Sequence, residues 1–462
     1  MPARPNTRER FSAVDCLRLR RVPFMARRNY ILEVQHLLLW GLFAGLVEGT
    51  VSAVVVAKTF GGSELLITTV NATPAIANLV SLYWGALIVG RRKLACFMAF
   101  GAASLAATLA VAITPQSHWG GWLFAGQILL SRVFMSGVVT ARASLWKSNY
   151  PRSHRGRITA GLQVVRTAMS LPVIFGGGLL FDARPEAYHW FYPAIAAAGA
   201  LGLLVFRKEH VRGEKARLSG RTREDAATLA DPAVSEPFSL VAMVMPWRLL
   251  RRMRQTLRDD PKFARYCKAQ MCIGVANLLV IPVNTIVMTR QLNLSYFAAN
   301  GLLDGIPRVV ILLMLPVWAR MFDRVGVLRF RAVNTLCWCG SLALCGAGAW
   351  CAERHEAGAM GFFGLSMVAY VLGRLCDGAA QSGGAIAWNI GHLHFVEDDQ
   401  AELYMGIHVS LTGVRGLVAP FAGVLLYQTA GVAVFVVGFV ISVIGWKIFA
   451  NLAREEVTTV RR

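Results

Sequence analysis

Long apolar runs dominate this sequence and decide what the chain can fold into. Each run holds about 20 residues, which as a helix matches the roughly 30 Å hydrocarbon core of a bilayer. Glycine and proline within the runs are tolerated in membrane helices because neighbouring helices satisfy the freed backbone groups. The composition agrees, since 55% of the 462 residues are hydrophobic. We therefore predict an all-α polytopic membrane protein.

The runs predict twelve transmembrane helices in two groups of six. The expected spans are 30–57, 65–89, 94–113, 122–146, 158–181, 190–206, 263–288, 294–318, 327–350, 360–388, 401–427 and 432–452. The only long polar segment lies between the sixth and the seventh span. The expected domains are a basic tail at 1–29, a six-helix bundle at 30–206, a linker at 207–262, a second six-helix bundle at 263–453 and a tail at 454–462.

Part of the linker has a helical pattern of its own. From about 246 to 258, Trp247, Leu250, Met253 and Leu257 recur at helical spacing, with arginines between them. This pattern is typical of an amphipathic helix that lies on the anionic inner leaflet of a membrane. A binding site for a regulatory partner is the alternative interpretation.

The formal net charge of +22 indicates topology. Outside the spans, Lys and Arg gather on the side that holds both termini and the linker. The opposite side holds few: Lys58, Arg184, Arg290 and Arg354. This asymmetry follows the positive-inside rule, so we expect both termini in the cytoplasm and the protein in the lipid bilayer of a bacterial inner membrane. Because topology explains the basic residues, we expect no nucleic-acid partner.

The two halves repeat each other. Leu130, Arg132, Ala143 and Trp146 of the fourth span align without a gap on Leu372, Arg374, Ala385 and Trp388 of the tenth. In the second and eighth spans, Asn71 and Asp304 each stand three residues before a proline, Pro74 or Pro307. Matches in corresponding spans indicate duplication of a six-span unit, which is typical of secondary transporters.

Two loops carry related basic motifs. The loop between spans eight and nine reads Ala319-Arg-Met-Phe-Asp323-Arg324-Val-Gly326, and the loop between spans two and three contains Gly85, Gly90, Arg91 and Arg92. With these motifs the chain resembles the major facilitator superfamily over essentially its whole length after residue 29. In that superfamily the corresponding loops follow a Gly-x-x-x-Asp-Arg-x-Gly pattern. This chain has Ala319 in place of the first Gly of the later loop, and its earlier loop lacks the Asp. The resemblance implies a gating role for these residues.

Ionisable residues within the spans are the candidate functional residues, because a charge at bilayer depth is costly unless it is paired or hydrated. Five arginines lie near the middle of their spans: Arg132, Arg166, Arg308, Arg374 and Arg415. The acids at comparable depth are Glu48, Asp304 and Asp377. Asp304 and Arg308 are four residues apart, and Arg374 and Asp377 three apart, so each pair can share a helix face. Arginines remain in excess.

The resemblance implies that spans one, four, seven and ten line a central cavity, which makes Glu48, Arg132, Arg374 and Asp377 the candidate substrate-binding residues. Arg132 and Arg374 could together grip a carboxylate or phosphate, since guanidinium matches such oxyanions. Glu48, Asp377 or Asp304 could carry a coupling proton. For the remaining arginines, Arg166, Arg308 and Arg415, we expect a packing role.

These residues predict secondary active transport of a small anionic solute by alternating access, coupled to a proton or another ion, in a monomer. Efflux of an amphipathic drug or metabolite is one alternative. A transporter-like sensor or assembly subunit without flux is another.

An enzyme is not expected, because nucleotide-binding and zinc-protease motifs are missing from the sequence. A metal site can be drawn in the loop between spans ten and eleven from His392, His394, Glu397, Asp398, Asp399 and Glu402, with His408 beyond. Acidic runs in such loops are usually just solvated. We therefore predict neither a metal nor a cofactor.

Overall fold

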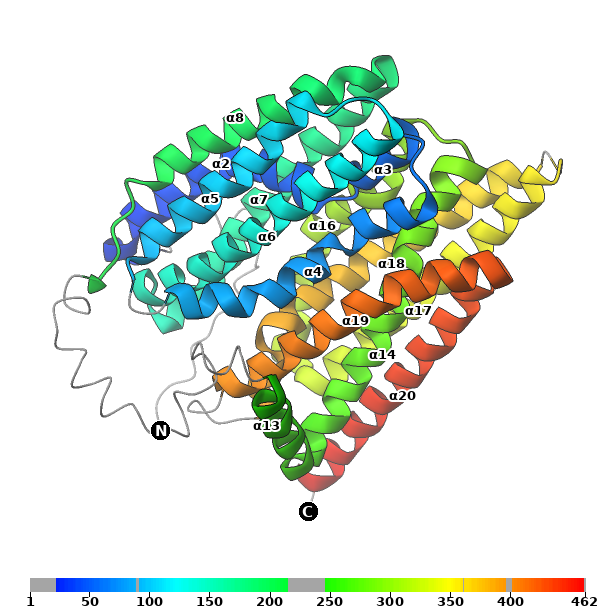
Figure 1. The fold of residues 1–462 in the computed structure, drawn as a ribbon. Helices are drawn as coiled ribbons and strands as arrows, with labels where there is room; N and C mark the ends of the chain where they lie inside the picture. Colours follow the sequence, from blue (N-terminus) through cyan, green and yellow to red (C-terminus); the bar gives the residue numbers. More distant parts are fainter. Residues whose placement is uncertain (1–21, 89–90, 215–245, 360, 396–400, 461–462) are drawn as a thin grey trace.

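The computed structural model describes residues 22–88, 91–214, 246–359, 361–395 and 401–460. Within these ranges the chain is almost entirely helical and has no strand (Figure 1). Eleven helical segments in the described ranges are long and apolar enough to cross a membrane. The predicted second span corresponds to a further helix, α4 (Glu64–Ile88), which packs beside the others. The predicted polytopic all-α class is confirmed.

The first bundle contains the elements η2 (Phe24–Ala26), α2 (Arg27–Glu48), α3 (Val51–Lys58), α4, α5 (Lys93–Leu109), η3 (Ala110–Ile113), α6 (His118–Asn149), α7 (Arg152–Ala183), η4 (Pro185–Ala187) and α8 (Tyr188–Phe206). In it, α2 packs against α7 and α8, and α6 packs against α4 and α5. Most of these helices exceed 15 residues because their apolar composition is uninterrupted over the thickness of a bilayer.

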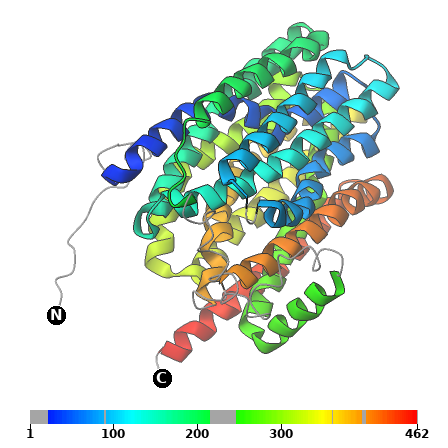
Figure 2. The same cartoon turned by 60° about the vertical axis from the view of Figure 1, so that its left-hand side comes forward.

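The second bundle contains α14 (Pro261–Ile286), η6 (Val287–Gln291), α15 (Tyr296–Asn300), η7 (Gly301–Gly305), α16 (Ile306–Val325), α17 (Val327–Glu356), α18 (Phe362–Ile390), η8 (Gly391–His394), α19 (Ala401–Ala430) and α20 (Ala433–Val460). In it, α14 packs against α19 and α20, and α18 packs against α16 and α17. Figures 1 and 2 show the first bundle, in blue to blue-green and green, beside the second, which runs from the bright green of α14 through yellow to red.

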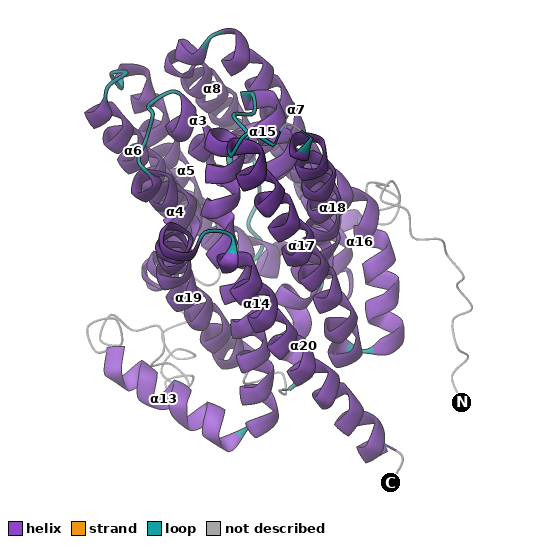
Figure 3. Cartoon of the chain, turned by 90° about the vertical axis from the view of Figure 1, so that its right-hand side faces the viewer, coloured by secondary structure: helices purple, strands orange, loops and turns teal. Residues whose placement is uncertain are grey.

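The start of α2 and the end of α20 lie at the same end of the molecule, which we call the termini end (Figure 1). The opposite end we call the far end. At the termini end lies also α13 (Pro246–Asp259), over the residues for which the sequence predicts an amphipathic helix. α13 is inclined to α14, the span that follows it (Figure 3).

Among the described residues, the apolar core that the two bundles share lies towards the far end. One buried cluster combines residues of α3 and α7, such as Val54 and Phe181, with residues of the second bundle, such as Val283 and Tyr296. Towards the termini end the core divides. There, one cluster built around Trp40 belongs wholly to the first bundle, and others belong wholly to the second. Among the described residues, the bundles are therefore sealed against each other at the far end. Towards the termini end no buried cluster combines them, although α4 and α19 remain in contact near the middle of the spans.

The first span is not one continuous helix, as the sequence predicts, but is broken between Glu48 and Val51. Gly49 and Thr50 lie at the break, and Gly49 has an extended backbone. Spans seven and eight also contain irregular turns, because η6 and η7 are π-helical. Single π-turns inside membrane helices free backbone groups for other partners, and they are frequent at functional sites.

The eight residues after α8 pack onto the first bundle, although they belong to the predicted linker. Val211 is buried there. The Asn29 side chain donates to the His210 carbonyl at 2.7 Å, and the Lys93 amide donates to the Glu214 carboxylate at 2.8 Å. Residues 207–214 thus form a strap across the termini end of the first bundle.

Candidate functional site

Seven of the charged residues that the sequence singles out lie around the seam between the two bundles. They are Glu48, Arg132, Arg166, Asp304, Arg308, Arg374 and Asp377, and we call them the midplane cluster. Asp304 is central to it, since it interacts electrostatically with Arg132 of the first bundle and with Arg374 and Asp377 of the second. Helices from both halves of the chain therefore bring these charges together.

Three ion pairs neutralise six of the seven charges. Arg374 contacts Asp377 at 2.8 Å and Arg308 contacts Asp304 at 3.4 Å, as their spacing predicts. Arg166 of α7 pairs with Glu48 at the end of α2. The side chains of Arg166 and Glu48 are 24% and 27% exposed, although they lie at mid-span, so protein does not fill the seam beside them.

Asp304 also links the two bundles. Its Oδ2 accepts from the Thr50 backbone amide at 2.8 Å, at the break in the first span. The break is what exposes this amide, because an uninterrupted helix would bond it internally. A side chain at Gly49 would collide with the same carboxylate oxygen, which explains the glycine there. A second contact across the seam runs from Arg308 Nη1 to Ser170 Oγ of α7, at 3.1 Å.

Arg132 is the one arginine of the midplane cluster that has no carboxylate partner among the described residues. It is 5% exposed, and its Nη2 donates to the Gly49 carbonyl at 2.9 Å. Its buried Nε has no hydrogen-bond partner in the described structure. With four arginines and three acids, the cluster keeps one uncompensated positive charge, and that charge is on Arg132.

In contrast to Arg132, Arg374 has both carbonyl and carboxylate partners for its guanidinium. Besides Asp377, it donates to the carbonyl of Leu302 at 3.1 Å and to that of Leu303 at 2.6 Å. Both carbonyls lie in the π-turn η7, which leaves them available. Gln381 donates to Asp377 at 2.7 Å and completes this group. In this conformation the guanidinium of Arg374 is committed to the protein.

Arg415 lies away from the midplane cluster. Its Nη1 donates to the Gln270 carbonyl of α14 at 2.6 Å, and its guanidinium fills the space where a side chain at Gly274 would be. Sequence reasoning missed its neighbour Arg331, which is 3% exposed. Arg331 donates to Asn334 at 3.2 Å and lies over the Phe449 ring at 5.1 Å. It lies near the end of the predicted ninth span, where a charged side chain can reach the membrane surface, so its position alone does not single it out.

A second buried polar group lies in the first bundle towards the termini end. Glu33 accepts from Tyr150 at 2.6 Å and from Trp146 at 2.7 Å. His36 Nδ1 lies 2.8 Å from the Gly202 carbonyl and its Nε2 lies 2.7 Å from Arg142. Since the first contact needs a proton on Nδ1 and the second a lone pair on Nε2, His36 is neutral here.

The strap adds a second acid to this group. Glu209 is 5% exposed and accepts from Asn149 at 2.8 Å. Burial, and then the neighbouring charge of Glu33, raise the pKa of Glu209 to about 9. The carboxyl therefore holds a proton at neutral pH.

Polar contacts across the seam at the far end were not predicted from the sequence. Asp182, at the end of α7, accepts from the backbone amides of Tyr296 at 2.5 Å and Phe297 at 3.0 Å, and so caps α15 of the other bundle. Thr59 Oγ1 contacts the Tyr296 hydroxyl at 2.9 Å, and Lys58 donates to Asn293 at 3.5 Å. These contacts reinforce the apolar seal.

The expected gating residues lie at the termini end where the structure describes them. Arg91, Arg92 and Arg324 are exposed, and Gly85 lies within α4. Gly90 and the side chain of Asp323 lie outside the described residues.

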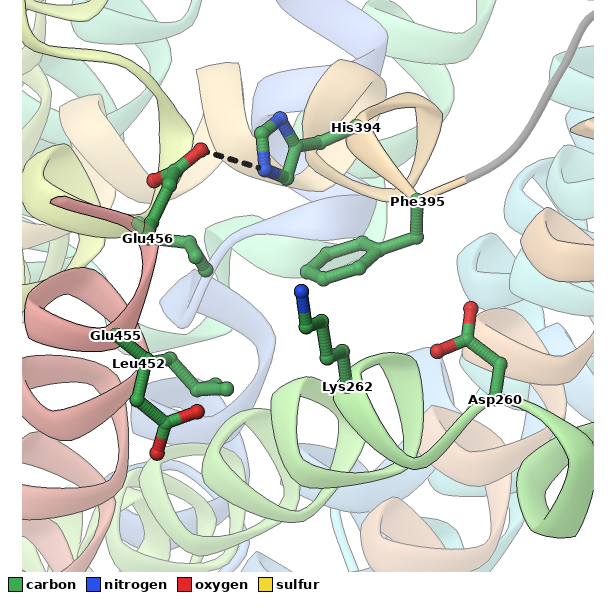
Figure 4. A pocket seen from close by; sticks show the side chains of 8 residues that line it. Asp260, Lys262, His394, Phe395, Leu452, Glu455 and Glu456 are labelled. Carbon is green, nitrogen blue, oxygen red and sulfur yellow. Dashed lines mark ion pairs between the residues drawn. The ribbon is translucent and has the colours of Figure 1, made fainter. Parts of the chain in front are cut away.

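The candidate metal ligands do not gather in the described structure, where no group of three metal-binding side chains occurs. His394 instead contacts Glu456 at 3.1 Å, at the edge of a cavity of about 250 Å³ between η8, α14, α17 and α20 (Figure 4). Glu397, Asp398, Asp399 and the side chains of His392 and Glu402 lie outside the described residues.

The two-bundle architecture has solved counterparts. The structure superposes on the nucleoside transporter NupG with a TM-score of 0.62 and 13% identity, covering 91% of this chain and 98% of that one. A D-xylose–proton symporter matches with a TM-score of 0.62 and 14% identity, over 91% of this chain and 96% of that one. The chain has the major facilitator fold.

A peptide transporter, POT, solved in complex with sulfate, also matches, with a TM-score of 0.62, 14% identity, and coverage of 96% of this chain and 99% of that one. No protein-family model and no curated protein sequence matches the chain. At these identities the likeness establishes the major facilitator fold, which the sequence resemblance predicts, and leaves the substrate to be argued from the residues.

Proposed function

We propose that this protein is a secondary active transporter that moves a small anionic solute together with a proton by alternating access. The structural neighbours named above are transporters, which supports transport as the class of function. The division of the core supports the mechanism, because the bundles, among the described residues, are sealed at one end and share no buried cluster towards the other, which represents one state of a rocking cycle. By the positive-inside rule, the open end would face the cytoplasm.

The main support for an anionic substrate is the uncompensated charge of Arg132. A buried guanidinium without a carboxylate is costly in a bilayer, and a bound carboxylate or phosphate would supply the missing charge. The unpartnered Nε of Arg132 gives such a group a donor. Arg374 would contribute to the field around the site, since its donors are already engaged.

Asp304 is the proposed proton-coupling group. When ionised, it holds the Thr50 amide of the first bundle and pairs with Arg308 of the second. An anion bound at Arg132 would place a negative charge near Asp304 and so favour its protonation. The protonated carboxyl would hold both partners less tightly, which would weaken the link across the seam. Anion and proton together would thereby allow the bundles to rearrange.

Flux in proteoliposomes tests this proposal. With an inward-directed proton gradient and a panel of carboxylates and organic phosphates, the wild-type protein should accumulate an anion. Arg132→Ala should lose roughly 10- to 100-fold in apparent affinity, because charge-assisted hydrogen bonds contribute about 1.5–3 kcal/mol. Arg132→Lys, which keeps the charge, should lose less. Arg415→Ala is the matched control, since it removes a span arginine outside the midplane cluster.

Other outcomes would contradict the anionic reading. Normal anion transport by a folded Arg132→Ala variant would show that Arg132 does not bind the anion. Accumulation of cations or neutral amphipaths would favour efflux of drugs or metabolites. Absence of flux for every compound, in protein that elutes as a folded species, would favour a sensor or assembly subunit.

A further inference from the structure

The helix α13 presents a face of arginines that has no counterpart elsewhere in the described linker. Arg251, Arg254 and Arg258 are exposed, and their spacing of three and four residues places them on one side of the helix. No hydrogen bond or ion pair with a described residue engages their guanidinium groups. The face is therefore a patch of three positive charges directed away from the protein.

Another side of α13 is fixed to the second bundle. Met253 and Leu257 pack against the buried cluster that contains Phe263 and Leu452. Residue 260 alone separates α13 from α14, which begins a membrane span. Asp260 caps α14 by accepting from the Phe263 amide at 2.9 Å. The attachment places α13 next to the end of the seventh span.

This position puts α13 at the level where lipid headgroups end the bilayer. α14 begins directly after it, and Figures 1 and 3 show α13 at the termini end, inclined to α14. Clusters of Lys and Arg directly beside the cytoplasmic end of a membrane span are attracted to anionic lipid headgroups. Phosphate oxygens of these lipids match guanidinium groups in charge and in geometry.

We propose that the arginine face of α13 is a docking surface for anionic phospholipids of the leaflet at the termini end. Lipid phosphates neutralise Arg251, Arg254 and Arg258 and hold α13 against the membrane. The same contact fixes the start of α14, and through the hydrogen bond of Tyr404 to Asp260 (3.1 Å) it reaches α19. The surface is independent of the solute site, since none of its residues belongs to the midplane cluster.

Native mass spectrometry of the full-length protein tests this surface. Protein purified from nanodiscs of phosphatidylcholine and phosphatidylglycerol, mixed three to one, should retain phosphatidylglycerol in preference to phosphatidylcholine. The variant Arg251→Gln/Arg254→Gln/Arg258→Gln should lose at least about threefold of the retained phosphatidylglycerol. The corresponding triple Lys variant should retain most of it, because the charges remain. Size-exclusion profiles confirm that each variant is folded.

A matched control separates this surface from net charge. Arg207→Gln/Lys208→Gln/Arg329→Gln removes three exposed positive charges elsewhere in the chain, and it should keep the wild-type lipid ratio. An equal loss in this control would overturn the proposal, because any loss of charge would then suffice. Wild-type retention by the α13 Gln variant would overturn it as well. A third outcome would also overturn it: no preference for phosphatidylglycerol in the mixed nanodiscs, together with heparin binding in pure phosphatidylcholine nanodiscs that the α13 Gln variant loses. That result would indicate a soluble acidic partner.

Discussion

At the scale of single residues, partners distinguish arginines that look alike in the sequence. Arg166, Arg308 and Arg374 each have an acid beside them, and Arg415 has a backbone carbonyl. Only Arg132 combines a place in the midplane cluster with the lack of a described carboxylate partner. The guanidinium of Arg132 is therefore the one available to bind an anionic ligand.

Asp304→Asn should separate transport from its driving force. An asparagine can still accept from the Thr50 amide, but it cannot change its charge or balance Arg308. We expect exchange of labelled for unlabelled solute across the membrane to continue. Accumulation driven by a proton gradient should fall by roughly tenfold or more. Normal accumulation by the Asn variant would assign the proton to another group, with Glu48 and Asp377 as the next candidates.

Glu209→Gln should remove a pH dependence of stability. Between the ordinary pKa of a glutamic acid and the value of about 9 in the fold, the folded state binds more protons at Glu209 than the unfolded state does. Stability from this group is thus complete at low pH and is lost as pH rises through that window. Thermal unfolding from pH 5 to pH 9 should show a falling Tm for the wild type and a flatter profile for the Gln variant. Parallel profiles would contradict the assignment.

At the scale of elements, local spacing predicts more than long-range contact does. The ion pairs Asp304–Arg308 and Arg374–Asp377 follow from positions three or four apart on one helix, so the sequence contains them. The break in the first span is different. It depends on Asp304, which lies 254 residues away from Thr50, and a single apolar run carries no sign of it.

The contacts at the far end escaped prediction for a similar reason. In the sequence, Asp182 is an acidic residue in the loop after the predicted fifth span. It caps α15 only because the two bundles approach each other there. In the sequence, α15 and η7 form one apolar run with α16, and nothing marks the π-turn. Residues whose role is set by the partner bundle cannot be recognised without the fold.

Asp182→Ala should loosen the far end. The carboxylate caps two backbone amides of α15 across the seam, and loss of a cap costs about 1 kcal/mol. We expect the Tyr296 and Phe297 amides to exchange hydrogen several-fold faster, with less change in α18. Exchange could be followed by mass spectrometry of peptides from the protein in nanodiscs. Unchanged exchange in α15 would show that the apolar cluster alone seals this end.

At the scale of the whole molecule, the distribution of the core is the main result. Apolar residues of both bundles form one cluster at the far end, and separate clusters towards the termini end. The twelve apolar runs predict two such bundles but not which end is closed. Closure at the far end depends on side chains of α3, α7 and α15, which lie far apart in the sequence.

Cross-linking of the far end tests alternating access most directly. Lys58 and Asn293 contact each other at 3.5 Å across the seam, and cysteines at these positions, in a background without the native cysteines, can be joined by a short cleavable thiol cross-linker. We predict that joining them stops flux of the solute and that cleaving the linker restores it, while each single cysteine variant is insensitive to the reagent. Unchanged flux through the joined protein would show that this end need not open, and would contradict transport by rocking of the two bundles.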